Sequence, residues 1–233
     1  MKAILVSQYG GPEVLEYNDC SNPSPGPDEV LVRVAAASIN PFDLKRRSGV
    51  LKAYAPIEFP GIPGVDVVGT VVSCGRNVKG LSTGDRVFGM ADHTYAELCV
   101  IKAESLAIIP AGLDLVEAAA IPMATTTGCQ LIMKGALIRP GQSILVTGAV
   151  GNVGRAAMFT AKSLGAKVFA GIRKSQLERA VTLDVDGVIA VDEKNSVTNL
   201  QALDAVADTI GGTIAELLIG KVKPGEIFTS VIG

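Results

Sequence analysis

Three closely spaced glycines are the residues of this chain whose spacing indicates chemistry most directly. Gly148, Gly151 and Gly154 lie between an apolar segment, 143–147, and a stretch typical of a helix, 155–164. Glycines at this spacing let the backbone turn tightly and approach a pyrophosphate, and the following helix offers N–H groups and the positive end of its dipole to the phosphates. The sequence therefore predicts a phosphate-binding turn. The alternative is an ordinary strand-to-helix turn of an α/β protein.

A second apolar segment, 167–172, follows that helix, and the order strand, glycine turn, helix, strand is the unit that binds dinucleotides. In units that prefer NAD, an acidic residue closes this second strand and bonds the ribose 2′-hydroxyl. Here Arg173 and Lys174 follow the strand, and the next carboxylate is Glu178. The two cations can pair with a 2′-phosphate, which predicts NADPH rather than NADH. The alternative is that they only solvate the start of a helix.

The elements that must position these groups change in character along the chain. We predict strands over 30–36, 65–73, 86–88 and 95–101, helices over 114–120 and 125–134, and further strands over 143–147, 167–172, 187–191, 204–208 and 226–231. Strands that alternate with helices indicate a parallel sheet. The sequence thus predicts an α/β protein with a β-rich domain over 1–118 and a nucleotide-binding domain over 119–233.

The composition excludes several classes of function. The chain has 233 residues, 48% of them hydrophobic, and a net charge of −2 without a basic stripe, so nucleic acid is not an expected partner. Its mean hydropathy of +0.39 fits a parallel sheet buried on both faces. No apolar run approaches the roughly 18 residues of a membrane helix. The first residues do not resemble a signal peptide, which predicts a cytoplasmic protein without a membrane partner.

Metal binding is not expected from the cysteine and histidine content. Cys20, Cys74, Cys99 and Cys129 are widely spaced and form no Cys-x-x-Cys pair, and His93 is the single histidine. A zinc site needs about four nitrogen or sulfur ligands, usually in paired spacing. The cysteines are therefore predicted to be thiols in a reducing compartment. His93, which has no evident partner, is predicted to be a loop residue rather than a catalytic one.

Several phrases of the sequence occur in the same order as in a known family. They are 40–49 (Asn-Pro-Phe-Asp-Leu-Lys-Arg-Arg-Ser-Gly), 63–69, 84–87, 95–97, Thr127 before the glycine turn, and 208–212. Together they resemble the medium-chain dehydrogenase/reductase superfamily, in its zinc-free quinone oxidoreductase branch, over essentially the whole chain. The resemblance implies a GroES-like N-terminal domain, a Rossmann domain with a doubly wound parallel sheet, and NADPH bound in the cleft between them.

The resemblance also implies an activity. Positions 38–40 and 65–66 correspond to the positions of the zinc ligands in metal-dependent members, but the ligand residues of those members are absent here. Hydride transfer without a metal is therefore expected, from C4 of the nicotinamide to a quinone or an α,β-unsaturated carbonyl, with water as the source of the proton. One alternative is a catalytically impaired NADPH-binding protein, either a sensor or a fragment. Another is a zinc alcohol dehydrogenase, against which the missing ligands argue.

Candidate site residues follow from these matches and from residue type. Asn40 is expected to fix the cofactor ring or polarise a substrate carbonyl, Lys45 to reach the ribose or a substrate oxygen, and Tyr54 to line the pocket or donate a proton. The alternatives are a solvated lysine and a stacked, non-catalytic tyrosine. The expected cofactor-binding residues are Asn40, Thr127, Ala149, Val150, Gly151, Asn152, Val153, Gly154, Gly171, Arg173, Lys174, Ile210 and Val231, and no metal ligand is expected.

Two positions depart from the branch, and the chain stops early relative to it. Val191 stands where a tyrosine often helps to hold the phosphate end, and Asp184 replaces a usual glycine. The last residues coincide with the end of the fifth Rossmann strand, whereas the family adds a sixth. We therefore expect a truncated chain whose last strand is missing. The resulting edge strand would have unpaired backbone groups through which a homo-oligomer can form.

Overall fold

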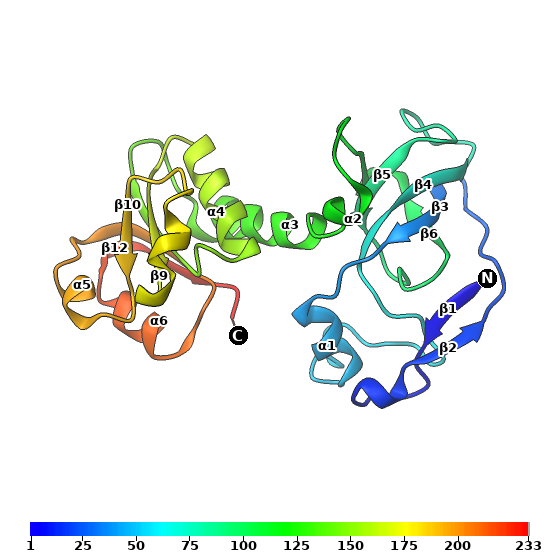
Figure 1. The fold of residues 1–233 in the computed structure, drawn as a ribbon, viewed down its shortest axis with the longest axis horizontal. Coiled ribbons are helices and arrows are strands. Elements are labelled where there is room, and N and C mark those ends of the chain that lie inside the picture. The colour runs from blue at the N-terminus through cyan, green and yellow to red at the C-terminus, as the bar shows by residue number, and fades with distance from the viewer. Residues whose placement is uncertain (233) are drawn as a thin grey trace. The chain divides into compact units, whose positions relative to one another are not determined.

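The computed structural model describes residues 1–232, and the chain divides into two compact units, Met1–Met123 and Ala124–Gly233. The division falls within helix α3 (Pro122–Gln130). The boundary predicted after residue 118 lies at the end of the preceding helix, α2 (Leu115–Ala118). Each unit has its own sheet (Figure 1). Each also has its own buried aliphatic core. The predicted combination of a β-rich fold and a parallel α/β fold is confirmed.

The first unit is built on a five-stranded antiparallel sheet in the order β6-β3-β4-β5-β7. Its strands are β3 (Glu29–Ala36), β4 (Asp66–Cys74), β5 (Arg86–Met90), β6 (Leu98–Lys102) and β7 (Leu106–Ile108), and a separate two-stranded sheet holds β1 (Lys2–Leu5) and β2 (Glu16–Asp19). Along β3, Val30 and Val32 are fully buried and pack with Val67, Val71 and Val87. This period-two burial is what a strand with one face on a core requires.

Short helices complete the first unit. They are the 3₁₀ turns η1 (Pro12–Val14) and η2 (Ala103–Ser105), the helix α1 (Pro41–Arg47) and the helix α2. At the start of α2, the Asp114 side chain accepts from two backbone N–H groups, as expected for an acidic N-cap. At the start of α1, the backbone N–H of Asn40 donates to the Asp43 carboxylate at 2.8 Å. The sequence prediction does not include α1, because a helix of seven residues is too short to show a clear period.

The second unit is a five-stranded parallel sheet in the order β10-β9-β8-β11-β12. Its strands are β8 (Ser143–Thr147), β9 (Lys167–Ile172), β10 (Gly187–Ala190), β11 (Leu203–Asp208) and β12 (Val222–Ser230). Its helices are α3, the π-helix η3 (Leu131–Ala136), α4 (Asn152–Ser163), the 3₁₀ helix η4 (Lys174–Ala180), α5 (Lys194–Thr198) and α6 (Gly212–Ile219). Along β8, Ile144 and Val146 pack in one core cluster and Leu145 in another, so both faces of the sheet are covered.

Strand β8 lies at the topological switch point of this sheet. Its neighbours are β9, the next strand along the chain, and β11, so the order of the strands reverses at β8. In open α/β sheets, ligands bind outside the carboxyl ends of the strands at such a point. The glycine turn identified in the sequence follows β8 directly, and the fold therefore places it where a ligand is expected.

Two helices of the second unit differ from the sequence prediction. α4 begins at Asn152 rather than at 155, because Gly151 is its N-cap and Gly154 is already helical. The helix predicted over 125–134 is α3 followed without a break by η3. Leu137, which caps the end of η3, is in a left-handed conformation with a φ of 49°. A π-helix is rare, and where it interrupts an α-helix it is frequently found at a functional site.

A pH dependence of stability is expected from Asp204 in β11. Its carboxylate accepts from Lys223 Nζ at 2.5 Å and from the backbone N–H and hydroxyl of Ser143 at 2.7 and 2.8 Å, and these hydrogen bonds lower the pKa of Asp204 to about 2. Because the folded-state pKa lies below that of the unfolded chain, the stabilisation is present above about pH 4 and is lost as the pH falls toward 2. We expect Asp204→Asn to lower the free energy of unfolding by about 1–2 kcal/mol at neutral pH, measured by urea denaturation.

The difference between Asp204→Asn and the unmodified chain should shrink as the pH is lowered from about 5 to about 3. A difference that stays constant over this range would contradict the role assigned to the carboxylate.

Candidate functional site

The turn after β8 uses its three glycines for different reasons. Gly148 has a φ of +60°, and a Cβ there would lie 2.3 Å from Thr209 Oγ1. Gly154 is buried in the first turn of α4, where a Cβ would lie 2.3 Å from the Gly148 carbonyl oxygen. Gly151 is the N-cap of α4, and a Cβ there would meet only that same oxygen, at 3.1 Å. The fold therefore requires Gly148 and Gly154, whereas Gly151 leaves space on the outside of the turn.

This space lies at the start of α4. Gly151 and Asn152 are exposed, and Val153 is half-buried. The first N–H groups of α4 have no acceptor within the helix, as at any helix start, so a phosphate beside Gly151 meets free donors and the positive end of the helix dipole. The side chains of Ala149 and Val150 are buried, so these two predicted residues can contribute backbone groups only.

Strand β9 ends close to the same turn. The backbone N–H of Ala149 donates to the Gly171 carbonyl oxygen at 3.2 Å. A Cβ on Gly171 would lie 3.1 Å from Val191 and 3.2 Å from Thr147, which leaves little room for any side chain. The structure thus brings the predicted Gly171 to the glycine turn.

Two carboxylates that the sequence prediction does not include lie beside Lys174. Its backbone N–H donates to Asp192 Oδ1 at 2.7 Å, and its ammonium group pairs with Glu193 Oε1 at 3.2 Å. Both acids follow β10, which pairs with β9 in the sheet. The sequence prediction considered the residues that follow β9 along the chain and missed those that the neighbouring strand brings there. Arg173 is exposed, and no ion pair among residues 1–232 involves it.

Helix α3 packs closely on α4. A Cβ on Gly128 would lie 2.7 Å from Ala156 Cβ and 2.7 Å from the Val153 carbonyl oxygen, so a larger residue would push the helices apart. The neighbouring Thr127 is half-buried. Gly128 is a site residue that the sequence prediction missed, because a single glycine within a helical segment gives no sign of what it packs against. Its effect is to bring the helix that carries Thr127 against the first turns of α4.

Asp208, at the carboxyl end of β11, ties three strand ends together. Its fully buried carboxylate accepts from Thr147 Oγ1 at 2.7 Å and from Ser230 Oγ at 2.8 Å. It also accepts from the backbone N–H groups of Ile210 and Gly211 at 3.1 and 3.0 Å. Because Thr147 ends β8 and Ser230 ends β12, one side chain fixes the carboxyl ends of β8, β11 and β12.

The loop after β11 is held beside the glycine turn by the same network. The Thr209 hydroxyl donates to the Thr147 carbonyl oxygen at 2.8 Å, and the Thr209 N–H donates to Thr147 Oγ1 at 2.8 Å. The backbone N–H of Val231 donates to the Asp208 carbonyl oxygen at 3.1 Å. The predicted Ile210 and Val231 therefore lie at the same edge of the sheet as the glycine turn. Asp208, which places them there, is absent from the predicted site residues.

In the first unit, the Asn40 side chain is held by Asp66 and Ser38. Asp66 is 1% exposed. Its Oδ2 accepts hydrogen bonds from Asn40 Nδ2, at 2.9 Å, and from the Ser38 hydroxyl. Its Oδ1 accepts a hydrogen bond from the Met123 N–H at 2.9 Å. Asn40 Nδ2 also donates to Ser38 Oγ at 3.0 Å. Because a carboxylate only accepts, the amide nitrogen must face Asp66. Ser38 and Asp66 thus fix which way the Asn40 amide faces.

Asp43 and Tyr95 hold the backbone around Asn40. Asp43 is 6% exposed, and its Oδ2 accepts from the Asn40 N–H at 2.8 Å, whereas Oδ1 has no partner within residues 1–232. Burial raises the pKa of Asp43, against the effect of that N–H. The Tyr95 hydroxyl donates to the Ser38 carbonyl oxygen at 3.1 Å, and burial, together with the charge of Asp43, raises the pKa of Tyr95. The segment that carries Asn40 is thus fixed at both ends.

The other two candidate catalytic residues are not held in this network. Lys45 is exposed on α1, and Tyr54 is 89% exposed in the turn that follows α1. Within residues 1–232, neither side chain takes part in a hydrogen bond or an ion pair, although the Lys45 carbonyl oxygen accepts a hydrogen bond from the Ser48 hydroxyl. The structure therefore holds Asn40 in a network of hydrogen bonds and leaves Lys45 and Tyr54 at the surface.

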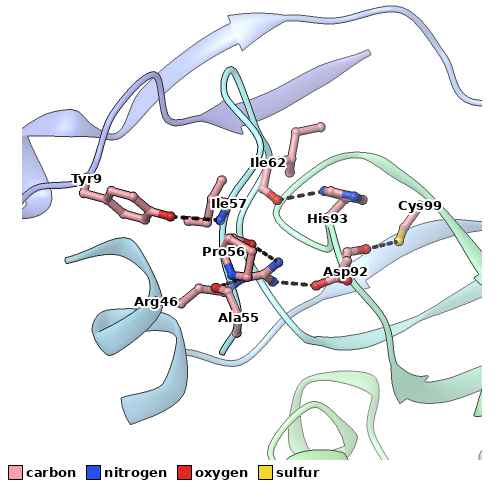
Figure 2. Close-up of polar contacts among 9 residues, drawn as sticks. All are labelled: Tyr9, Arg46, Ala55, Pro56, Ile57, Ile62, Asp92, His93 and Cys99. Atoms are coloured by element: carbon pink, nitrogen blue, oxygen red, sulfur yellow. Dashed lines mark hydrogen bonds and ion pairs between the residues drawn. The ribbon is translucent and has the colours of Figure 1, made fainter. Parts of the chain in front are cut away.

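The segment that follows Tyr54 is anchored by Arg46 (Figure 2). The guanidinium group donates to the carbonyl oxygens of Ala55 and Pro56 at 3.3 and 3.1 Å and pairs with Asp92 at 2.5 Å. The thiol of Cys99 donates to the Asp92 carbonyl oxygen at 3.4 Å, and burial raises the pKa of Cys99 to about 12. Cys99 is therefore a structural thiol and not a nucleophile at neutral pH.

His93 lies in the same cluster and is exposed (Figure 2). Its Nδ1 is 3.0 Å from the Ile62 carbonyl oxygen, which can only accept, so Nδ1 carries the proton of this bond. His93 has a φ of 67°, which is unusual for a residue other than glycine. These contacts place it in a turn that it helps to fix.

Replacing Asp66 should loosen the Asn40 site. In Asp66→Asn, an amide nitrogen that can only donate replaces one of the two accepting oxygens. If the remaining oxygen keeps the Met123 N–H, the new NH₂ group faces two donors, Asn40 and Ser38. We expect the free energy of unfolding to fall by about 2 kcal/mol, measured by chemical denaturation. As a control, Asp85→Asn changes a carboxylate that caps an exposed turn and should lower it by less than about 1 kcal/mol; equal losses would contradict the role of Asp66.

Two features of other protein classes are not found in the part of the chain that the structure describes. No helix there combines the length and the apolar character that crossing a membrane requires. Within the same residues, no three His, Cys, Asp or Glu side chains gather closely enough to hold a metal ion.

Comparisons with known proteins agree with this architecture. The family model of the alcohol dehydrogenase GroES-like domain matches residues 26–112. The chain is 34% identical to a 2-methylene-furan-3-one reductase from Solanum lycopersicum, over 97% of this chain and 60% of that protein. It is also 34% identical to a chloroplastic NADPH-dependent alkenal/one oxidoreductase from Arabidopsis thaliana, over 100% of this chain and 63% of that protein. The chain thus spans less than two thirds of the length of these curated relatives.

Among solved structures, the quinone oxidoreductase from Coxiella burnetii matches with a TM-score of 0.82 and 30% identity, covering 98% of this chain and 74% of that one. The match therefore includes both units and not the GroES-like region alone. The chain belongs to the medium-chain dehydrogenase/reductase superfamily, in its quinone oxidoreductase branch.

Proposed function

We propose that this chain binds NADPH and that the protein reduces quinones or α,β-unsaturated carbonyls without a metal. The observation that carries the proposal is the glycine turn at the switch point, where Gly151 leaves open space at the start of α4. The names of the relatives support it, since one is an NADPH-dependent alkenal/one oxidoreductase and a similar structure is a quinone oxidoreductase.

In this proposal the residues of the chain bind and orient, and NADPH supplies the hydride. The first turn of α4 binds the pyrophosphate, and Arg173 and Lys174 lie at the 2′-phosphate end. Thr127 and Asn40 serve the nicotinamide end. Asp66 and Ser38 orient the Asn40 amide, which serves either to fix the cofactor ring or to polarise a substrate carbonyl.

Reduction of the substrate needs a proton in addition to the hydride. Tyr95 and Cys99 are poor donors, because burial raises the pKa of both and their hydrogens are engaged with carbonyl oxygens. Lys45 and Tyr54 are exposed to solvent. We therefore propose water as the source of the proton, with Lys45 and Tyr54 contributing to substrate contacts.

The test is a fluorescence titration with NADPH followed by addition of a simple quinone or an enal in the same cuvette. Binding followed by oxidation of NADPH supports the proposal. Binding without oxidation favours a catalytically impaired NADPH-binding protein, and no binding contradicts the assignment of the glycine turn. Turnover that survives dialysis against a chelator supports the metal-free mechanism, and its loss, with recovery on adding zinc, contradicts it.

A further inference from the structure

The end of β9 and the turn after β10 form a charged cluster of Lys174, Asp192 and Glu193. The backbone N–H of Lys174 donates to Asp192 Oδ1 at 2.7 Å, and the Lys174 ammonium group is 3.2 Å from Glu193 Oε1. The side chains of Lys174 and Glu193 are 64% and 44% exposed. The cluster therefore lies where a ligand at the end of β9 can reach it.

The backbone N–H and the ammonium group of Lys174 are both groups to which a phosphate at this place could bind. Phosphates bind to backbone N–H groups and to cations. Here Asp192 already accepts from the N–H of Lys174, and Glu193 already pairs with its ammonium group. A phosphate monoester carries a charge of about −1.5 to −2 near pH 7. The Lys174 ammonium group has three hydrogens, so a 2′-phosphate can contact it beside Glu193, but the phosphate then lies close to the negative charges of Asp192 and Glu193. A ribose 2′-hydroxyl is neutral and meets no such repulsion.

We propose that Asp192 and Glu193 are specificity-determining residues that weaken the preference of this chain for the 2′-phosphate of NADPH over the 2′-hydroxyl of NADH. The inference rests on the proposed binding of a dinucleotide at the glycine turn. Arg173, which forms no ion pair within residues 1–232, is then the cation that favours NADPH, and the two acids oppose it. In the opposite arrangement, Glu193 would orient Lys174 toward the phosphate, and removing its charge would weaken NADPH binding.

The experiment measures the Kd of NADPH and of NADH by fluorescence titration of the full chain and of two isosteric variants. Glu193→Gln and Asp192→Asn each remove one negative charge but keep an oxygen that can accept from Lys174. We expect each variant to bind NADPH about five- to tenfold more tightly than the unmodified chain, with the Kd of NADH changed by less than about twofold. The control Glu216→Gln removes the same charge from an exposed position on α6 and should change neither Kd.

Each outcome decides between the alternatives. A ratio of the two Kd values that is unchanged in both variants overturns the inference, as does weaker NADPH binding by Glu193→Gln. Equal tightening in Glu216→Gln also overturns it, because the effect would then come from net charge. If both dinucleotides bind and the ratio stays constant, only the inference fails. If neither binds to the unmodified chain or to any variant, the proposed function fails, and the inference fails with it.

Discussion

The Gly154→Ala variant is expected to lose stability and dinucleotide binding together. Its Cβ would lie 2.3 Å from the Gly148 carbonyl oxygen, 2.8 Å from the carbonyl carbon and 2.9 Å from Ala149 Cα, all of which are backbone atoms. Backbone cannot move aside as the end of a flexible side chain can, so α4 must shift away from β8. We expect the free energy of unfolding to fall by about 2–3 kcal/mol and NADPH to bind more than tenfold more weakly.

The matched control is Gly151→Ala, three residues earlier in the same turn. There the added Cβ would meet only the Gly148 carbonyl oxygen, at 3.1 Å, and the backbone conformation at Gly151 suits any residue. Stability should change by less than about 1 kcal/mol. If the pyrophosphate approaches the turn at Gly151, the methyl group should still weaken NADPH binding at least about tenfold.

The pair of variants separates the fold from the site. Urea denaturation followed by circular dichroism gives the stability, and fluorescence titration gives the Kd of NADPH. Full binding by Gly151→Ala would mean that no phosphate approaches there, and unchanged stability of Gly154→Ala would mean that α4 does not depend on the close contact with β8.

The elements that could be predicted from the sequence are those whose signal is local. β8 and β9 have the predicted bounds, 143–147 and 167–172, because each is a continuous apolar run between turn residues. The glycine turn could be predicted because its three glycines follow each other in the order that a phosphate-binding turn requires. The start of α4 could not, since Gly151 and Gly154 show their separate roles only when the approach of α4 to Gly148 is known.

The contacts that hold the candidate site join residues far apart in the chain. Asp66 is 26 residues from Asn40, and Asp192 is 18 residues from Lys174. The order of the strands and the place where each loop ends decide which carboxylate contacts which donor. Residue types and their spacing in the sequence predict neither of these. The sequence therefore predicted Asn40 and Lys174 as site residues, whereas the acids that orient or oppose them required the structure.

The largest loss of stability is expected from Asp208→Ala. The variant leaves two hydroxyls, of Thr147 and Ser230, and two backbone N–H groups, of Ile210 and Gly211, without the carboxylate that accepts from them. Water does not reach Asp208, which is 0% exposed. Each buried donor left without an acceptor costs about 1–3 kcal/mol, and because four donors are involved we expect the free energy of unfolding to fall by about 3–5 kcal/mol.

Two further variants test whether this loss comes from the hydrogen bonds. Asp208→Asn keeps the shape and one accepting oxygen, so it should lose about half as much as Asp208→Ala. Asp184→Ala removes a carboxylate that pairs with Lys162 but is 92% exposed, and it should lose less than about 1 kcal/mol. Because the Asp208 network joins the ends of β8, β11 and β12 beside the glycine turn, Asp208→Asn should also weaken NADPH binding while the chain remains folded. Equal losses in Asp208→Asn and Asp184→Ala would mean that the strand ends are held by packing rather than by this carboxylate.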